Sequence, residues 1–483
     1  MPINSRKGFD CGYSESLGDM TGDKVISSSP LCQFVPAFIS FTTYLTTAHI
    51  DSSSALFAVV LKIPIHNTSI YFDKLYNLRV LLLGTGLVVE YLFYVCANSI
   101  FKSKDNRIYI SLINLFLILV TRFVFAALTH FSSQLAYHVY IILAVEAFFC
   151  GCLMSLTAIV PEHSVVVTLG YNVCRMFVPF FQFILDLMLH GHPLVLIKIQ
   201  CWASVLLTAF ALGSWGYYTH SCSNPTSGSK GEDDPEAGLA SNPGSVSPPE
   251  VEVASFSETM REALSPFLMF PAASMFKDFL YPGVLPFSLL QREKCHIINI
   301  LATACYGLAS ITFFVLERVG VFEEWNGYYD GFWVLTIPIN AVPIYAFLAI
   351  HTRVPSAVKI RNSRPIVMAM TLSVILYYSF LYSLSYGGVP KVVHTAFKGK
   401  RKTGDKSVIT FYVISTMVYR FFFSKLSVGY NHTRVALGYH LPKFRPNHRM
   451  SNSNTFWYII KNMFKRAGKD IIGDFRRNIK NYL

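Results

Sequence analysis

Charged residues are scarce in this chain. Of its 483 residues only 14% are Asp, Glu, Lys or Arg, and 52% are hydrophobic, whereas soluble globular chains carry about 25% charged residues. The mean hydropathy is +0.41. Because the apolar residues come in long blocks separated by short polar stretches, the sequence excludes an ordinary soluble fold and indicates helices that cross a lipid bilayer.

The motifs of soluble enzymes and of ATP-driven pumps are also absent. No GxxxxGK[ST], HExxH or GxSxG stretch occurs, so the sequence encodes no P-loop, no zincin site and no nucleophile elbow. Neither a CxxC pair nor a His/Cys metal spacing appears. We therefore predict no catalytic residue, no metal and no cofactor, and an integral membrane enzyme is the least favoured of the functions considered.

The apolar runs predict about eleven membrane-spanning helices, each of about 20 residues. They cover residues 31–50, 75–98, 108–128, 134–159, 165–189, 194–219, 264–290, 296–319, 331–350, 366–388 and 407–429. Four prolines interrupt the seventh run. Residues 55–65 are apolar but too short to span, so we expect a re-entrant or interfacial segment there.

A long polar break divides these spans into six and five. Residues 221–254 hold one Lys and six carboxylates among many Ser, Gly and Pro, and such a segment cannot bury a core. Two helical bundles joined by a long loop is a common transporter plan. We predict an all-α integral membrane protein with a 6+5 two-bundle, major-facilitator-like arrangement. Its expected parts are a polar tail (1–30), a six-helix bundle (31–219), a disordered acidic loop (220–262), a five-helix bundle (263–429) and a basic tail (430–483).

Basic residues in the loops predict the orientation. The segments on the N-terminal side hold 14 Lys and Arg, against 8 on the other side, or 12 when the nearest tail residues are added. The excess favours a cytosolic N-terminus. Two sequons, at Asn67 and Asn431, fall on the opposite side and are candidates for glycosylation. We expect a multi-pass protein of the plasma membrane rather than of an internal membrane.

The net charge of +13 lies in loops and in the tail, so we predict no nucleic-acid partner. From Phe456 to Ile479 apolar residues recur at helical spacing, and lysines and arginines lie off that stripe. This pattern is typical of a basic amphipathic helix on a membrane surface, where it would contact anionic lipid. A partly disordered tail is the alternative.

Four polar residues of the fifth span share one face. Asn172, Arg175, Gln182 and Asp186 fall within about 80° of one another at 100° per residue. Since lipid would not tolerate such a stripe, we expect it to face the interior. It forms either the wall of a hydrated pathway or a structural network of hydrogen bonds between helices.

Other ionisable groups also fall inside spans. Glu146, in the fourth span, is a predicted partner for Arg175, and as a buried carboxylate it could alternatively titrate and couple transport to protons. Gly170, and Ala209 with Gly213, are predicted to allow close helix contact. The further charges within spans are Glu90, Arg122, Lys277, Asp278 and Arg420.

Several short motifs together resemble the equilibrative nucleoside transporter family (solute carrier family 29 type). Residues 269–272 read Met-Phe-Pro-Ala and are similar to the Phe-Pro-Ala motif of that family's seventh span. Glu146-Ala147, Pro161 and residues 170–172 resemble its span-four motif, the turn that follows and its span-five motif. Residues 385–388, followed by a proline, resemble a drifted span-ten motif. The resemblance implies eleven spans, a cytosolic N-terminus and a long cytosolic loop after the sixth span.

One departure concerns the cargo. The Asp-x-x-x-Arg motif of the family's eighth span would fall near Tyr306 to Ser310, where neither charge is present. The chain therefore resembles a divergent branch, such as the multicopy parasite membrane proteins of the Tpr-related type, in which the fold is retained and nucleoside specificity is in doubt.

Two functions remain open. The first is a facilitative transporter of nucleosides, nucleobases or another small polar solute, working by alternating access. The second is a non-transporting membrane protein, a surface antigen or scaffold that keeps the fold. In the first, Tyr171, Tyr306 and Tyr386 would stack the solute. The predicted substrate pathway comprises Glu146, Gly170, Asn172, Arg175, Gln182, Asp186, Phe270, Pro271, Tyr306, Ser385 and Tyr386.

Overall fold

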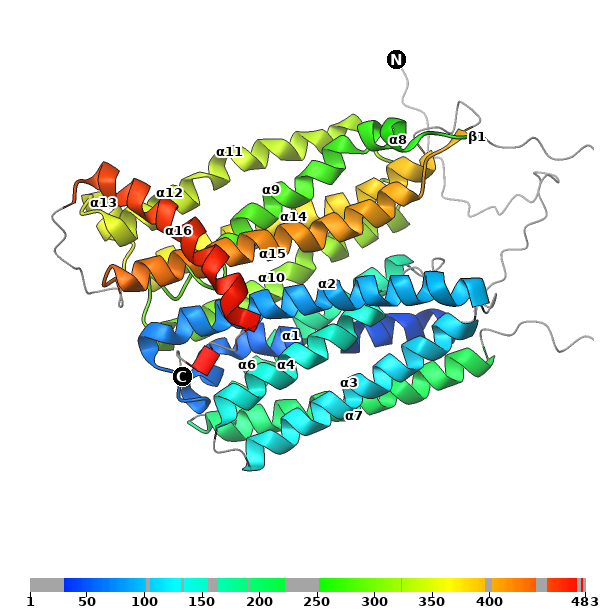
Figure 1. Cartoon of the computed structure of the whole chain (residues 1–483), viewed down its shortest axis with the longest axis horizontal. Coiled ribbons are helices and arrows are strands. Elements are labelled where there is room, and N and C mark those ends of the chain that lie inside the picture. Colours follow the sequence, from blue (N-terminus) through cyan, green and yellow to red (C-terminus); the bar gives the residue numbers. More distant parts are fainter. Residues whose placement is uncertain are drawn as a thin grey trace, which may run out of the picture.

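The computed structural model of the chain is helical nearly throughout (Figure 1). It describes residues 30–100, 105–131, 134–154, 156, 164–189, 191–221, 252–322, 324–395, 402–439, 450–475 and 479–480. Extended structure within these ranges is a parallel pair of two-residue strands, β1 (Glu252–Val253) and β2 (Lys402–Thr403). The predicted N-terminal tail, most of the predicted acidic loop and the Pro161 turn lie outside the described residues.

Six long helices form the first bundle, which fills the lower half of Figure 1. They are α1 (Pro30–Val60), α2 (Thr68–Ile100), α3 (Asp105–Phe131), α4 (Leu135–Leu153), α6 (Ser164–Met188) and α7 (Pro193–Ser221). α1 packs against α6 and α7, while α3 and α4 pack against each other. A short 3-10 helix, η1 (Ile65–Asn67), joins α1 to α2.

Five membrane-length segments form the second bundle, in the upper half of Figure 1. They are α9 (Leu264–Leu280), α10 (Arg292–Arg318), a segment built from η3 (Gly327–Leu335), α11 (Thr336–Ile339) and α12 (Ala341–His351), then α14 (Arg364–Thr395) and α15 (Ser407–Ala436). Two short helices, α8 (Phe256–Glu262) and α13 (Pro355–Val358), precede α9 and α14. α14 packs against α9 and α10, and α15 packs against α9.

The prediction of an all-α membrane protein with six plus five spans is confirmed. Eight described segments are long and apolar enough to cross a membrane. α1, α6 and α9 complete the two bundles but are not among these eight, because α1 and α6 carry polar residues and α9 has only 17 residues. The polar side chains of α1 are buried, including Thr43, Ser52 and Ser53, so lipid does not contact them.

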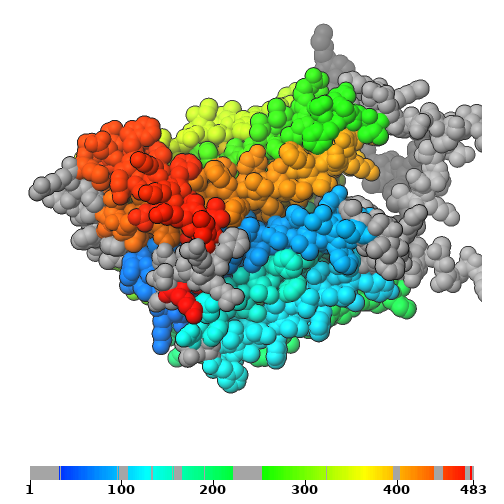
Figure 2. All heavy atoms as spheres, viewed as in Figure 1, coloured from blue at the N-terminus to red at the C-terminus, as the bar shows by residue number. Residues whose placement is uncertain are grey.

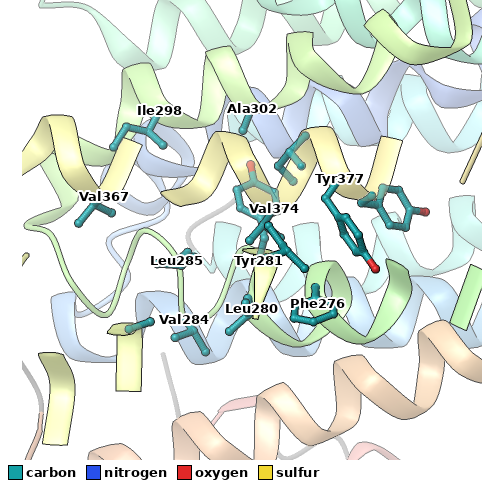
Figure 3. Packing of buried hydrophobic residues seen from close by; sticks show 14 of the residues in the cluster. Phe276, Leu280, Tyr281, Val284, Leu285, Ile298, Ala302, Val367, Val374 and Tyr377 are labelled. Atoms are coloured by element: carbon teal, nitrogen blue, oxygen red, sulfur yellow. The ribbon is translucent and has the colours of Figure 1, made fainter. Parts of the chain in front are cut away.

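Two predicted boundaries are wrong. The apolar stretch predicted at residues 55–65 does not begin a separate re-entrant segment, because residues 55–60 continue α1 to its end at Val60. The seventh span does not reach residue 290, because the helix stops at Leu280. Pro282 and Pro286 lack the N–H group that a helix interior needs. The segment that follows stays inside the protein, where Val284 and Leu285 pack among side chains of α9, α10 and α14 (Figure 3).

The two bundles meet along three pairs of helices. α10 packs against α6 and α1, and α15 packs against α2. Figure 2 shows α15, in orange, directly above α2, in blue. We call the end of the bundles at which η1 lies the η1 end. At this end α1 and α15 finish, and α2 and α10 begin.

The predicted tail helix is present as α16 (Asn452–Phe475). It crosses α15 toward α2 at the η1 end (Figure 1). The contact with α15 is close, since a Cβ added at Gly429 would lie 2.2 Å from the carbonyl oxygen of Met463. Ile479, just beyond α16, packs into the core of the first bundle. One face of the tail helix is therefore docked on protein rather than on lipid.

Candidate functional site

The polar stripe of α6 faces the protein interior. Asn172, Arg175 and Gln182 are no more than 8% exposed. On the opposite face, Phe180 and Leu187 are 64% and 70% exposed, as expected for side chains that contact lipid. The helix is thus polar inside and apolar outside.

The η1 end of this stripe is a hydrogen-bond network between helices. Gln182 accepts a hydrogen bond from Ser53 of α1 at 2.5 Å and is hydrogen-bonded to Gln200 of α7. Asp186 accepts from Gln182 at 2.8 Å, and its other oxygen lies 2.7 Å from Nε2 of His296 on α10. These contacts fit the structural interpretation of the stripe.

Arg175 has a different environment. Its guanidinium carbon lies 4.7 Å from the ring centroid of Tyr44 on α1 and 4.7 Å from that of Tyr306 on α10. Both distances are within the range of a cation–π contact. Asn172, one turn earlier, donates to the carbonyl of Thr168 in its own helix at 2.9 Å. Arg175 is therefore held by one aromatic ring from each bundle.

The predicted pairing of Glu146 with Arg175 is wrong. Glu146 accepts a hydrogen bond from Nε of Arg122 on α3 at 2.8 Å, and both side chains are buried. Arg122 also donates to Thr208 of α7 at 2.6 Å. The reason lies in the packing: α4 lies against α2 and α3, so Glu146 sits inside the first bundle and away from the second.

Charged and aromatic side chains from both bundles meet between them, and we call this group the interface cluster. The sequence predicts Arg175 and Tyr306 as pathway residues. It missed the other tyrosines, because a tyrosine in an apolar run carries no signal of what it faces. The cluster contains Tyr44, Asp51, Tyr76, Arg79 and Arg175 from the first bundle, and Lys277, Asp278, Tyr306, Tyr378, Tyr382 and Arg420 from the second.

Tyr76 of α2 is the central contact of the interface cluster. Its hydroxyl accepts hydrogen bonds from Lys277 at 2.7 Å and from Arg420 at 3.3 Å. It donates to Asp278 at 2.6 Å. Lys277 also pairs with Asp278 at 2.9 Å. A tyrosine of one bundle therefore holds two cations and a carboxylate of the other.

The second bundle contributes a column of tyrosines from α14. Rings of Tyr378 and Tyr382 are 5.4 Å apart, and those of Tyr382 and Tyr386 are 4.5 Å apart. Phe270 lies beside all three, at 6.0 to 6.5 Å. Phe270 and Ser385 are both fully buried, so these two predicted pathway residues belong to the packing of the second bundle.

The packing around the predicted glycine and proline positions shows which of them allow close contact between helices. A Cβ added at Gly170 would lie 2.2 Å from the carbonyl oxygen of Ala37, so the glycine allows close contact of α6 with α1. Gly213 has open space instead, and the close contact predicted for Ala209 and Gly213 does not form. Pro271 lies inside α9, partly buried.

The two sequons differ in exposure. Asn67 ends η1 and is partly exposed. Asn431 is completely buried in α15, where it donates a hydrogen bond to Asp73 of α2 at 2.8 Å. A glycosylating enzyme cannot reach Asn431 in this fold, and a glycan there would displace α2.

The bundles are closely packed around the interface cluster. A cavity of about 20 Å³ lies beside Asp51, Tyr76 and Arg79, which is room for about one water molecule. A larger cavity of about 400 Å³ opens at the η1 end, between η1, the start of α10 and Arg434. The cavity beside the cluster is too small for an organic solute.

Hydrogen bonds between the bundles gather toward the η1 end. Asn77 of α2 donates to Ser424 of α15 at 2.7 Å, and Asn299 of α10 donates to Ser54 of α1 at 2.8 Å. Asp73 accepts from Ser427 as well as from Asn431. Arg434 donates to Ser69 at 3.0 Å. In this conformation the two bundles are therefore joined by hydrogen bonds at the η1 end.

Comparisons with known proteins leave the family open. No family model and no curated protein matches the chain. Among solved structures, the nucleoside transporter NupG aligns with a TM-score of 0.41 at 11% identity, over 92% of this chain and 98% of that one. A bacterial homologue of the human drug peptide transporters aligns at 0.45 and 10%, over 92% and 97%. A bacterial homologue of the iron transporter ferroportin aligns at 0.43 and 12%, over 92% and 99%. At such scores these likenesses do not decide what this chain carries.

Proposed function

We propose that the chain is a transporter of a small polar solute that works by alternating access. In this proposal the bundle α1–α7 moves relative to the bundle α9–α15, and the solute binds between them at the interface cluster. Nucleosides and nucleobases are the cargo class that the sequence resemblance favours. The observation that carries the proposal is that buried charges and tyrosines of both bundles meet at one place.

The energetic argument concerns the cost of those charges. Each ionisable side chain at the centre of a bilayer costs ~2.5–3.5 kcal/mol on insertion scales. Arg175, Lys277 and Arg420 are all less than a tenth exposed. Apolar residues packed at the same interface would give a folded protein of equal or greater stability. Charges kept at a moving interface between repeats are typical of a solute or ion site.

The geometry also suggests how a solute would be held. Arg175, between two rings, and the column of tyrosines on α14 offer flat aromatic surfaces and hydroxyl groups. Planar ligands are commonly bound by stacking on such rings and by a few convergent polar groups. The fastened η1 end would keep the site closed on that side while the other side separates.

The non-transporting scaffold remains the second candidate, on a specific observation. Where the resembled family has the charged motif of its eighth span, this chain has Tyr306 to Ser310. Ser310 is committed to a hydrogen bond with Ser383 inside the second bundle, at 3.0 Å. A protein that had lost transport could keep such a packed interior.

Uptake measurements separate the two functions. The full chain, produced in cells that lack their own nucleoside transport, is tested with labelled adenosine, hypoxanthine and a panel of amino acids, peptides and organic acids. We expect saturable uptake of at least one solute, and faster exchange when the same solute is present inside. Surface-expressed, folded protein that gives no saturable uptake of any panel member would favour the scaffold.

A further inference from the structure

Cations outnumber carboxylates in the interface cluster. Its formal charges are four positive, from Arg79, Arg175, Lys277 and Arg420, and two negative, from Asp51 and Asp278. The four cationic side chains are all buried. Two other ion pairs within the described spans are balanced: buried Arg122 pairs with Glu146, and partly exposed Arg107 pairs with buried Glu90.

The two carboxylates cannot satisfy all four cations. Asp278 is occupied by Lys277, Tyr76 and Ser274. Asp51 lies beside the small cavity, and all four cations interact electrostatically with it. Asp73 of α2, one turn before Tyr76, accepts hydrogen bonds from Ser427 and Asn431 rather than from these cations.

Two guanidinium nitrogens of the cluster have no hydrogen-bond partner among the described residues. Nη1 of Arg79 and Nε of Arg420 are buried without a hydrogen-bond partner. Arg175 contacts two ring faces, and none of the described carboxylates forms an ion pair with it. Arginine donors match the oxygens of carboxylate and phosphate groups, and a buried cation without a counter-charge is strongly unfavourable.

We infer that the solute carried at the interface cluster is a small organic anion, whose carboxylate or phosphate group is bound by Arg175, Arg420 and Arg79 while its ring stacks on the tyrosines. This inference rests on the proposed transport function; among small polar solutes it favours anions over the neutral nucleosides that the sequence resemblance suggests. A neutral nucleoside leaves the excess positive charge uncompensated. An anion of the same shape supplies the missing counter-charge, and it binds most strongly in the closed conformation, where water is excluded.

The test compares pairs of solutes that differ in charge and little else. The purified full chain is reconstituted in liposomes, and uptake is measured for nicotinate against nicotinamide and for adenosine 5′-monophosphate against adenosine. We expect the anion of at least one pair to enter, and its neutral partner to enter roughly tenfold more slowly or not at all. A membrane potential positive inside should raise the anion's uptake. The first pair reports on carboxylates and the second on phosphates.

Variants at Arg175 separate charge from shape. Arg175→Gln should lower uptake of the preferred anion by roughly tenfold or more, and Arg175→Lys should retain part of the preference, because a lysine keeps the charge without the paired donors. Arg318→Gln is the matched control, since Arg318 is exposed and lies over the ring of Phe314 on its own helix, α10.

The possible results lead to different conclusions. Uptake of the neutral solutes at a rate equal to or above that of the anions overturns the inference and leaves the transport function standing. Absence of uptake of all four solutes by folded, reconstituted protein contradicts the inference, while the broader panel above then decides whether the chain transports at all.

Discussion

Asp470, on the tail helix α16, is ion-paired with Lys74 of α2, and both side chains are buried. The other oxygen of Asp470 lies 2.7 Å from Lys425 of α15. One carboxylate therefore joins a lysine of the first bundle to a lysine of the second. Burial opposes its charged form, but Lys425 and Lys74 outweigh burial and hold the pKa of Asp470 below its usual range. The carboxylate is ionised at neutral pH and fastens the η1 end.

The first prediction concerns this contact. Asp470→Asn removes the carboxylate that Lys74 and Lys425 share, and removing one partner of a buried pair typically costs about 3–5 kcal/mol. We expect a lower thermal unfolding temperature of the purified protein and faster proteolysis of α16. Lys469→Gln is the control, because Lys469 is exposed beside Asp470. Equal unfolding temperatures for Asp470→Asn and wild type would show that the pair does not fasten the helix.

A second prediction separates structure from proton coupling at Glu146. Glu146→Ala strands the buried Arg122, so we expect a loss of stability of about 3–5 kcal/mol and poor expression. The double variant Arg122→Met with Glu146→Leu removes both charges, and it should regain near wild-type stability and transport. Thermal unfolding and uptake of the preferred solute measure the two effects. A folded double variant that has lost transport would instead make Glu146 part of the transport mechanism.

How much of the candidate site the sequence predicts depends on the kind of contact that each residue makes. The inward face of α6 was predictable, because polar residues at helical spacing in an apolar run have one tolerable orientation. The partners of Arg175 were not, since they are tyrosines on α1 and α10, and rings give no charge pattern to match. Glu146 was assigned to Arg175 because α4 and α6 are close in sequence, whereas α4 packs on α2 and α3.

The end of the seventh span and the docking of α16 likewise depend on residues that are distant in sequence. The prolines of residues 281–290 were visible as an interruption, but whether that segment leaves the helix depends on the hydrophobic space that α10 and α14 provide for it. The amphipathic pattern of α16 predicted a helix with one apolar face. Whether that face meets lipid or protein depends on Gly429 and on the lysines that receive Asp470, which are distant in sequence.

The third prediction concerns the sequons. In a host that glycosylates membrane proteins, any glycan at these two sites should be on Asn67, because Asn431 is buried against Asp73. Asn67→Gln should abolish the change in gel mobility that a glycosidase produces, and Asn431→Gln should leave it in place. Loss of the glycan in Asn431→Gln alone would mean that α15 is not packed against α2 as described.

The last prediction tests movement of the bundles directly. Asn77 and Ser424 join α2 to α15 at the η1 end with a hydrogen bond of 2.7 Å. Cysteines at these two positions, joined by a short thiol cross-linker, should hold the η1 end closed. Because alternating access requires both ends to open in turn, we expect the cross-link to abolish transport and cleavage of a reducible linker to restore it.

Ser310 and Ser383 provide the control for that experiment. Their hydroxyl oxygens are 3.0 Å apart and join α10 to α14 within the second bundle. If each bundle moves as a rigid unit, a cross-link between cysteines at 310 and 383 should leave transport nearly unchanged. Full transport by the cross-linked 77–424 protein would show that the η1 end need not open. Loss of transport with both cross-links would show instead that the helices of the second bundle move against one another, since a rigid bundle would be indifferent to the internal link.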